Sequence, residues 1–195
     1  MTLPDQEAAP TVAERRAARR ANQTAFNLVL ALLASLGIVL FLVVVVVRPE
    51  MEPRTVDFGE IGAAAQASVD EPLAVPDLPA EWTANRAELV ANPADGVTRW
   101  EIGFLTPEGQ YIGLVQGVDA NDSWLADQVR SARSGGTEHI GGLTWNSYDR
   151  RDVADPGNIE YALATTSGAS TIVLGGTASE EEFAVLAAAV AEGLE

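Results

Sequence analysis

A long apolar run near the N-terminus constrains this chain more than any other feature of its sequence. The run extends over 20 residues, Leu28–Val47, and no charged side chain occurs from Ala21 to Val47. A helix of that length rises about 30 Å, which matches the hydrocarbon core of a bilayer. A core helix of a soluble protein is usually shorter and keeps a polar face, which this run lacks. We therefore predict a transmembrane helix over residues 26–47, within an anchor segment of residues 21–48, with the lipid bilayer as its partner.

The sequence around the run indicates a signal anchor that stays attached. Signal peptides have shorter apolar regions and a cleavage site of small residues, whereas here Val47 is followed directly by Arg48 and Pro49. By the positive-inside rule the N-terminus is cytoplasmic, because four arginines precede the run and two follow it: Arg15, Arg16, Arg19 and Arg20 against Arg48 and Arg54. We predict a single-pass protein of the cell membrane with a cytoplasmic tail, residues 1–20, and an extracytoplasmic C-terminal domain.

The part of the chain after the run is strongly acidic and lacks cysteine. Beyond Arg48 it has 7 arginines and 25 acidic residues, a net charge of −18. Such a surface disfavours nucleic acid, whose binding requires clustered cations. Without cysteine the chain has no disulfide framework and no thiolate site. The remaining length fits one domain, which we place at residues 82–195.

Residues 49–81 have the pattern of a short helix followed by a proline-rich linker. Asp57 and Glu60 resemble a capping box at the start of a helix over Phe58–Val69. Three prolines follow, which favour an extended path that ends at Trp82: Pro72, Pro76 and Pro79.

The segment WEIGFLTPEGQYIGLVQG, residues 100–117, has the clearest local signal, a β-hairpin. In the first part of this segment, large apolar residues occupy every second position, which is the period of a β-strand. Pro107–Gly109 then fits a three-residue hairpin loop. This turn would place Phe104 opposite Ile112 and Gly103 opposite Gly113. The glycine pair would allow either a packed helix or a ligand in a shallow groove to approach the sheet closely.

The rest of the sequence predicts two more helices and three strands. Asn121 or Asp122 can cap one helix, and Ser179 with Glu182 forms a capping box for a C-terminal helix. Short β-rich runs separated by turn residues predict a three-stranded meander over residues 141–151, 159–166 and 170–177. The predicted fold class is therefore α+β, with an antiparallel β-sheet flanked by helices on at least one face.

Catalytic and metal-binding patterns are weak. The single histidine, His139, is predicted in a solvated loop and cannot build a metal site without cysteine or further histidines. Asp119, Asn121 and Ser123 imitate the start of a calcium loop, but the glycine that such a loop needs is missing. We therefore predict no metal, no cofactor and no catalytic residue. A pair of carboxylates in a cleft stays open as an alternative, since the chain has many acids.

Aromatic residues favour binding over catalysis. Trp145 and Tyr148 fall on opposite faces of one predicted strand, so one of them should leave the core. An exposed aromatic near an arginine can stack a sugar or bind a partner protein. The alternative is ordinary core packing. The candidate binding residues are Gly103, Tyr111, Gly113, Trp145, Tyr148 and Arg150.

Several of these segments resemble an actinobacterial family known as domain of unknown function number 4245. The resemblance rests on the apolar run, LPAEW, the tryptophan hairpin, LTWNSYDRR and GGTASEEEFAVLAAAV. It implies a membrane-anchored envelope protein, and it supplies no catalytic residues. The order of strands and helices is also similar to the Mog1/PsbP-like fold, which implies a non-enzymatic binding or assembly module.

These observations together predict a membrane-anchored, extracytoplasmic binding or assembly module of the cell envelope, with an envelope protein or a glycan as its partner. The first alternative is a carboxylate-dependent hydrolase of cell-wall glycan. The second is a structural accessory subunit of a membrane protein complex.

Overall fold

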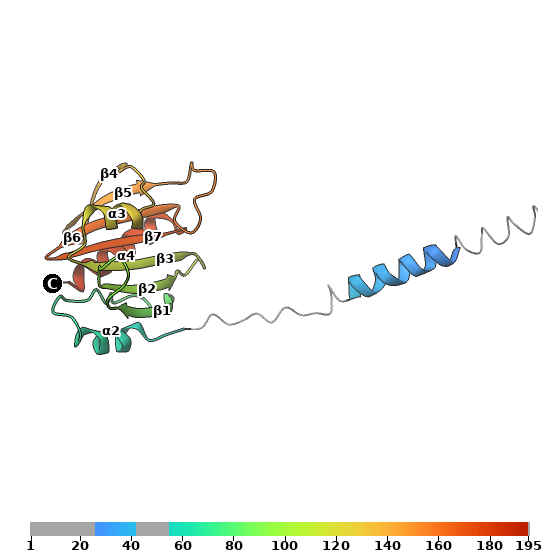
Figure 1. Cartoon of the computed structure of the whole chain (residues 1–195), viewed down its shortest axis with the longest axis horizontal. Coiled ribbons are helices and arrows are strands. Elements are labelled where there is room, and N and C mark those ends of the chain that lie inside the picture. Colours follow the sequence, from blue (N-terminus) through green and yellow to red (C-terminus); the bar gives the residue numbers. More distant parts are fainter. Residues whose placement is uncertain (1–25, 42–54, 195) are drawn as a thin grey trace, which may run out of the picture. The chain divides into compact units, whose positions relative to one another are not determined.

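The computed structural model describes residues 26–41 and 55–194, and the chain divides into two compact units, residues 1–51 and 52–195 (Figure 1). In the first unit, residues 26–41 form a helix whose side chains are exposed. Among the residues that the structure describes, none of the helices has the length and apolar character needed to span a membrane. The predicted tail, residues 1–20, and the end of the predicted span, residues 42–47, lie outside the described residues.

The second unit is an α+β domain, which confirms the predicted fold class. Its described residues hold a sheet of seven antiparallel strands in the order β1-β2-β3-β7-β6-β5-β4 (Figure 1). The strands are β1 (Thr83–Val90), β2 (Arg99–Leu105), β3 (Tyr111–Val118), β4 (Gly136–Ile140), β5 (Leu143–Asp149), β6 (Tyr161–Ser167) and β7 (Ser170–Gly176). The helices are α2 (Phe58–Gln66), α3 (Asp122–Gln128) and α4 (Glu180–Glu192).

The predicted hairpin and meander are confirmed. Phe104 pairs with Ile112 and Gly103 with Gly113 across β2 and β3. Gly109 takes a φ of 74°, which glycine adopts without strain, and closes the turn between these strands. Strands β5, β6 and β7 are neighbours in the sheet, as the spacing of the β-rich runs predicted.

Two strands were not predicted, and both lie at the edges of the sheet. Half of the residues of strand β1 are polar and its register shifts between Ala84 and Arg86, so it lacks a regular alternation. Strand β4 has five residues, and the predicted loop around His139 is wrong, because His139 lies within this strand. Its side chain is nonetheless exposed, with Nδ1 3.1 Å from Thr144 Oγ1. Edge strands are specified by their neighbours more than by their own sequence.

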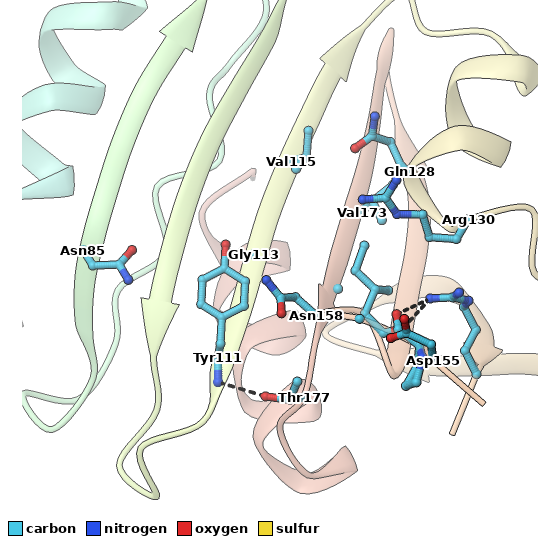
Figure 2. Close-up of a pocket in the computed structure, with 15 residues that line it drawn as sticks. Asn85, Tyr111, Gly113, Val115, Gln128, Arg130, Asp155, Asn158, Val173 and Thr177 are labelled. Carbon is cyan, nitrogen blue, oxygen red and sulfur yellow. Dashed lines mark hydrogen bonds between the residues drawn. The ribbon is translucent and has the colours of Figure 1, made fainter. Parts of the chain in front are cut away.

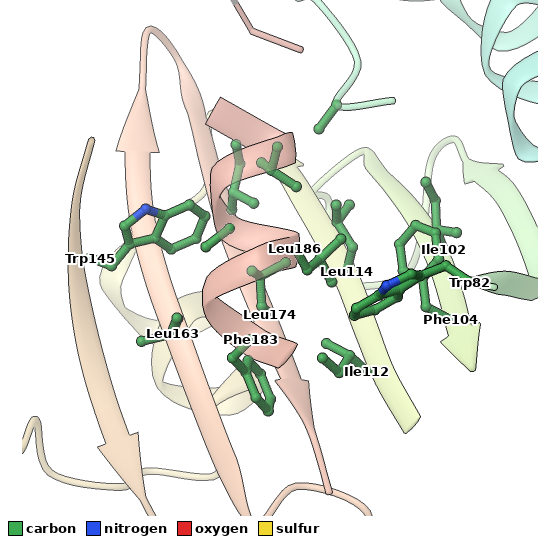
Figure 3. Packing of buried hydrophobic residues seen from close by; sticks show 14 of the residues in the cluster. Trp82, Ile102, Phe104, Ile112, Leu114, Trp145, Leu163, Leu174, Phe183 and Leu186 are labelled. Carbon is green, nitrogen blue, oxygen red and sulfur yellow. The ribbon is translucent and has the colours of Figure 1, made fainter. Parts of the chain in front are cut away.

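One face of the sheet, which we call the closed face, carries the main core. Helices α2 and α4 and the segment between α2 and β1 cover it, and Figure 3 shows α4 between Trp145 and Trp82. The Phe183 and Tyr161 rings meet edge-on at 5.1 Å. Helix α4 begins with the capping box predicted from Ser179 and Glu182. The buried apolar side chains of this cluster stabilise the domain through their removal from water.

The proline-rich segment, residues 67–82, is bound to the closed face through a buried glutamine. Gln116 is fully buried on β3, and its Oε1 accepts a hydrogen bond from Ala74 N at 2.7 Å. Its Nε2 donates to Pro72 O at 2.7 Å and to Ser170 Oγ at 2.8 Å. Trp100 Nε1 also donates to Ala74 O, at 2.9 Å. Because every one of these buried polar groups has a partner, the extended segment is held without a secondary structure of its own.

The other face, which we call the open face, is only partly covered. Helix α3 packs Trp124 and Val129 against Tyr148, Ala164 and Val173 in a smaller cluster. The prediction that Trp145 or Tyr148 leaves the core is wrong, because Trp145 is buried on the closed face and Tyr148 is buried under α3. A sheet with apolar clusters on both faces buries both members of such a pair.

Candidate functional site

A row of residues with little or no side chain crosses the open face. Gly103, Gly113, Gly175 and Ala162 lie side by side on β2, β3, β7 and β6, because each pairs directly with the next. Tyr148 on β5 ends the row. On β2, β3 and β7 this row therefore has no side chains of its own, so side chains from other positions can lie directly on the backbone. The sequence placed Gly103 opposite Gly113, but the extension through Gly175 depends on the pairing of β3 with β7.

The Tyr111 ring covers one end of this row. A Cβ atom at Gly103 would lie 3.3 Å from Tyr111 Oη, and one at Gly113 would lie 3.0 Å from it. Figure 2 shows the ring face-on over β3 as the sheet is viewed from its open face. Burial is the main cause that raises the pKa of the Tyr111 phenol, so the ring is neutral at physiological pH. The glycine pair thus accepts the Tyr111 ring from β3 in place of the helix that the sequence allowed.

A groove of about 880 Å³ lies beside the Tyr111 ring. Gly113, Gly175, Val115 and Val173 form its floor, and Ile159 contributes to a wall. The volume is in the range of small-molecule sites. The polar residues on its border are Asn85, Gln128, Arg130, Arg150, Asp155, Asn158 and Thr177 (Figure 2).

Arg150 shapes one wall of the groove. Its Nη1 donates to Pro156 O and to Ile159 O, at 2.7 Å in both cases. These bonds hold the loop over residues 150–159 beside the floor. Arg150 therefore lines the groove, and its Nη1 group is used to hold the loop.

Arg130 differs from Arg150 in having no such bonds. It follows the end of α3 with a φ of 55°, an unusual conformation for a residue with a side chain, and it is exposed. Within residues 55–194, no salt bridge or side-chain hydrogen bond is recorded for Arg130. Figure 2 shows its guanidinium directed from α3 toward the floor of the groove. The sequence offered no local signal for this residue, because its place depends on how α3 packs on the sheet.

The six predicted binding residues separate into two groups. Tyr111, Gly113 and Arg150 line the groove, and Gly103 lies under the Tyr111 ring. Trp145 belongs to the closed face, where its Nε1 donates to Ile140 O at 3.3 Å, and Tyr148 packs under α3. The structure thus brings four of the six together. Sequence reasoning missed the polar border of the groove at Asn85, Gln128, Arg130, Asn158 and Thr177.

On the open face, the carboxylate of Glu101 is engaged in ion pairs. Glu101 accepts from Arg99 Nε at 2.5 Å and lies 2.8 Å from Arg86 Nη2. Among the residues that line the groove, Asp155 is the one carboxylate. In the described part of the chain, acidic and histidine side chains form no cluster suited to a metal ion. The groove therefore offers hydrogen-bonding side chains and a cation beside an apolar floor, an arrangement suited to holding a ligand.

Comparison with known proteins gives one match. The model of the family described as Protein of unknown function (DUF4245) matches residues 20–190. No curated protein matches the chain. No solved structure matches it either, so the similarity to the Mog1/PsbP-like fold stays a prediction.

Proposed function

This chain belongs to the DUF4245 family, whose function is unknown, and we propose that it is a membrane-anchored binding module of the cell envelope that acts without catalysis. The domain would stand outside the cytoplasmic membrane, and the helix that begins at residue 26 would anchor it there. The ligand would be held in the groove on the open face.

The observation that carries this proposal is the groove over the paired glycines of the open face. Gly113 and Gly175 pair directly on the two central strands, where side chains would otherwise fill the open face. A Cβ atom at Gly175 would lie at ordinary contact distance from Ile159, 3.5 Å away, so only a small side chain fits there without displacing Ile159. The groove of about 880 Å³, bordered by polar side chains, supports a binding role.

The sequence supports the location. The apolar run from Leu28 to Val47 has the length of a bilayer-spanning helix, and more arginines precede it than follow it. An actinobacterial origin and a Mog1/PsbP-like arrangement, both predicted from sequence, are part of the same proposal. The Mog1/PsbP-like arrangement would favour a non-enzymatic binding or assembly module.

The rival functions have weaker support. A glycan hydrolase would need two carboxylates facing a cleft about 5–10 Å apart, whereas Asp155 is the one carboxylate that lines the groove. A structural accessory subunit would act by pairing its membrane helix with another helix. That role would not require a groove on the open face of the domain.

Photocrosslinking in intact cells tests the proposal. The photoreactive residue p-benzoylphenylalanine replaces Gln128 at the border of the groove in the full chain. The matched control carries it at Glu181, an exposed position on α4 and hence on the opposite side of the sheet. We expect an envelope component to crosslink at residue 128 and not at residue 181.

A second variant tests whether the floor is required. Gly175→Val adds a side chain to the floor and should abolish the crosslink at residue 128, while Gly175→Ala should reduce it less. Circular dichroism verifies that both variants are folded. Equal crosslinking at residues 128 and 181, or a crosslink unaffected by Gly175→Val, would refute the groove as the binding site. Protection of the domain from protease added to intact cells, with digestion after lysis, would refute the extracytoplasmic location.

A further inference from the structure

The chemistry of the groove indicates what kind of ligand it takes, on the premise that the proposed function holds. Two arginines and one aspartate line it, a local charge of +1, whereas residues 49–195 carry −18 in total from 7 arginines and 25 acids. The positive groove favours a ligand with a negative charge at a defined point, while the acidic surface around the groove repels negative charge placed elsewhere.

The arginine available for a ligand is Arg130. Arg150 Nη1 donates to the carbonyl groups of Pro156 and Ile159, while Arg130 is exposed and makes no salt bridge or side-chain hydrogen bond within residues 55–194. A guanidinium donates two parallel hydrogen bonds to a carboxylate. Arg130 at the edge of the floor can therefore fix the position of a carboxylate on the ligand.

The floor disfavours an extended peptide as the ligand. Peptides commonly bind by adding a strand to the edge of a sheet, or by placing side chains in separate pockets. Strands β3 and β7, which form the floor, are each paired on both sides, so their backbone groups are already used. The Tyr111 ring lies over Gly113 and the Ile159 side chain lies over Gly175, and the surrounding residues line one groove.

A sugar ring fits the same surface better. Its C–H face can lie on the Tyr111 ring and on the bare backbone beside it, since aromatic rings present an apolar face. Its hydroxyl groups can reach the side chains of Asn85, Gln128 and Asn158 on the border of the groove. Figure 2 shows Tyr111 between Asn85 on one side and Asn158 on the other.

We propose that the groove binds an acidic glycan, with a sugar ring stacked on Tyr111 and a carboxylate of the glycan held by Arg130. Uronic acid residues have both features in one ring. Asp155, which also lines the groove, accepts hydrogen bonds from sugar hydroxyl groups.

Calorimetric titration of the full chain in detergent micelles tests this inference. The probes are tetrasaccharides of galacturonate, mannuronate and alternating glucuronate and N-acetylglucosamine. The methyl ester of the galacturonate probe and a tetraglutamate peptide serve as comparisons. We expect at least one uronate probe to bind, its affinity to fall as salt rises, and the ester and the peptide to bind at least about tenfold more weakly.

Charge-removing variants identify the residue. Arg130→Gln should weaken binding of that probe about tenfold or more, whereas Arg133→Gln, an exposed arginine outside the groove lining, should leave it unchanged. Tyr111→Leu should weaken the acid and any residual binding of the ester by the same factor, since it removes the stacking surface common to both.

Each other result overturns the inference in a distinct way. No binding of any uronate probe, or equal binding of the acid and its ester, rejects the acidic glycan. Tighter binding of tetraglutamate assigns the groove to an acidic peptide. Equal effects of Arg130→Gln and Arg133→Gln reject Arg130 as the contact. A crosslink at residue 128 in cells would still support the proposed function in all these cases, and its absence would refute that function independently.

Discussion

The two faces of the sheet are built from the same strands, yet they are packed in opposite ways. On the closed face Trp100, Phe104, Ile112 and Phe183 are fully buried, and even the polar Gln116 is saturated with hydrogen bonds. On the open face the corresponding central positions include glycines, and part of the surface is a groove. The contrast teaches that the closed face buries most of the core, so part of the open face can stay a groove without loss of the fold.

The largest expected effect comes from removing the central tryptophan of the closed face. Trp100→Ala deletes a fully buried ring and leaves the Ala74 carbonyl without its donor, so it should lower the free energy of unfolding by about 3–5 kcal/mol. Tyr111→Ala on the open face should cost clearly less, because its ring is only partly buried. Urea denaturation followed by circular dichroism measures both. Equal costs would mean that the two faces contribute alike to stability.

Two neighbouring glycines give a sharper comparison within one strand. A Cβ atom at Gly176, which belongs to the closed face, would overlap the Tyr111 carbonyl oxygen and lie 2.9 Å from Ile112 Cα. Gly176→Ala should therefore destabilise the domain by about 1–3 kcal/mol, as overpacking does. Gly175→Ala on the groove floor meets ordinary contacts and should stabilise it by about 0.4–1 kcal/mol, since alanine restricts the unfolded chain. Thermal and urea unfolding measure the free energy of unfolding of both variants. A destabilised Gly175→Ala would argue against free space at the floor of the groove.

The smallest expected effect concerns the charged rim of the closed face. The side-chain hydrogen bond from Arg151 is the main cause that lowers the pKa of the Asp149 carboxyl, and Arg151 also contacts Glu180 on α4 at 2.6 Å. A carboxyl whose folded pKa is lowered stabilises the fold above its unfolded pKa, about 3.9, and this contribution is lost as the pH falls through the folded value. Because the pair is exposed, the contribution should stay below about 1 kcal/mol.

Acid titration of stability measures this contribution. The wild type should lose slightly more stability than Asp149→Asn between about pH 4 and pH 2, since the variant has no carboxyl to protonate at that position. Indistinguishable slopes would mean that the ion pair adds nothing to the burial of the closed face.

Local signals allowed a good part of the fold to be predicted from the sequence. The turn at Gly109 determined the register of β2 and β3, and the side chains of Asn121 and Ser179 cap the helices that they were predicted to cap. Each of these signals depends on a few residues close in the chain, where backbone hydrogen bonding and turn geometry leave few choices. The edge strand β4 was missed because its pairing with β5 supplies the stability that its own sequence lacks.

The sequence by itself determined the class of the domain, its central hairpin, its helix caps and the presence of a long apolar segment before it. Tertiary structure alone decided that β3 lies beside β7, and with it the row from Gly103 to Ala162, the polar border at Arg130 and Asn158, and the bonds of Gln116 to the proline-rich segment. The physical reason is the range of the interactions. Caps and turns are made by residues a few positions apart, whereas the groove is assembled from residues 85–177, which meet only when the whole sheet has formed.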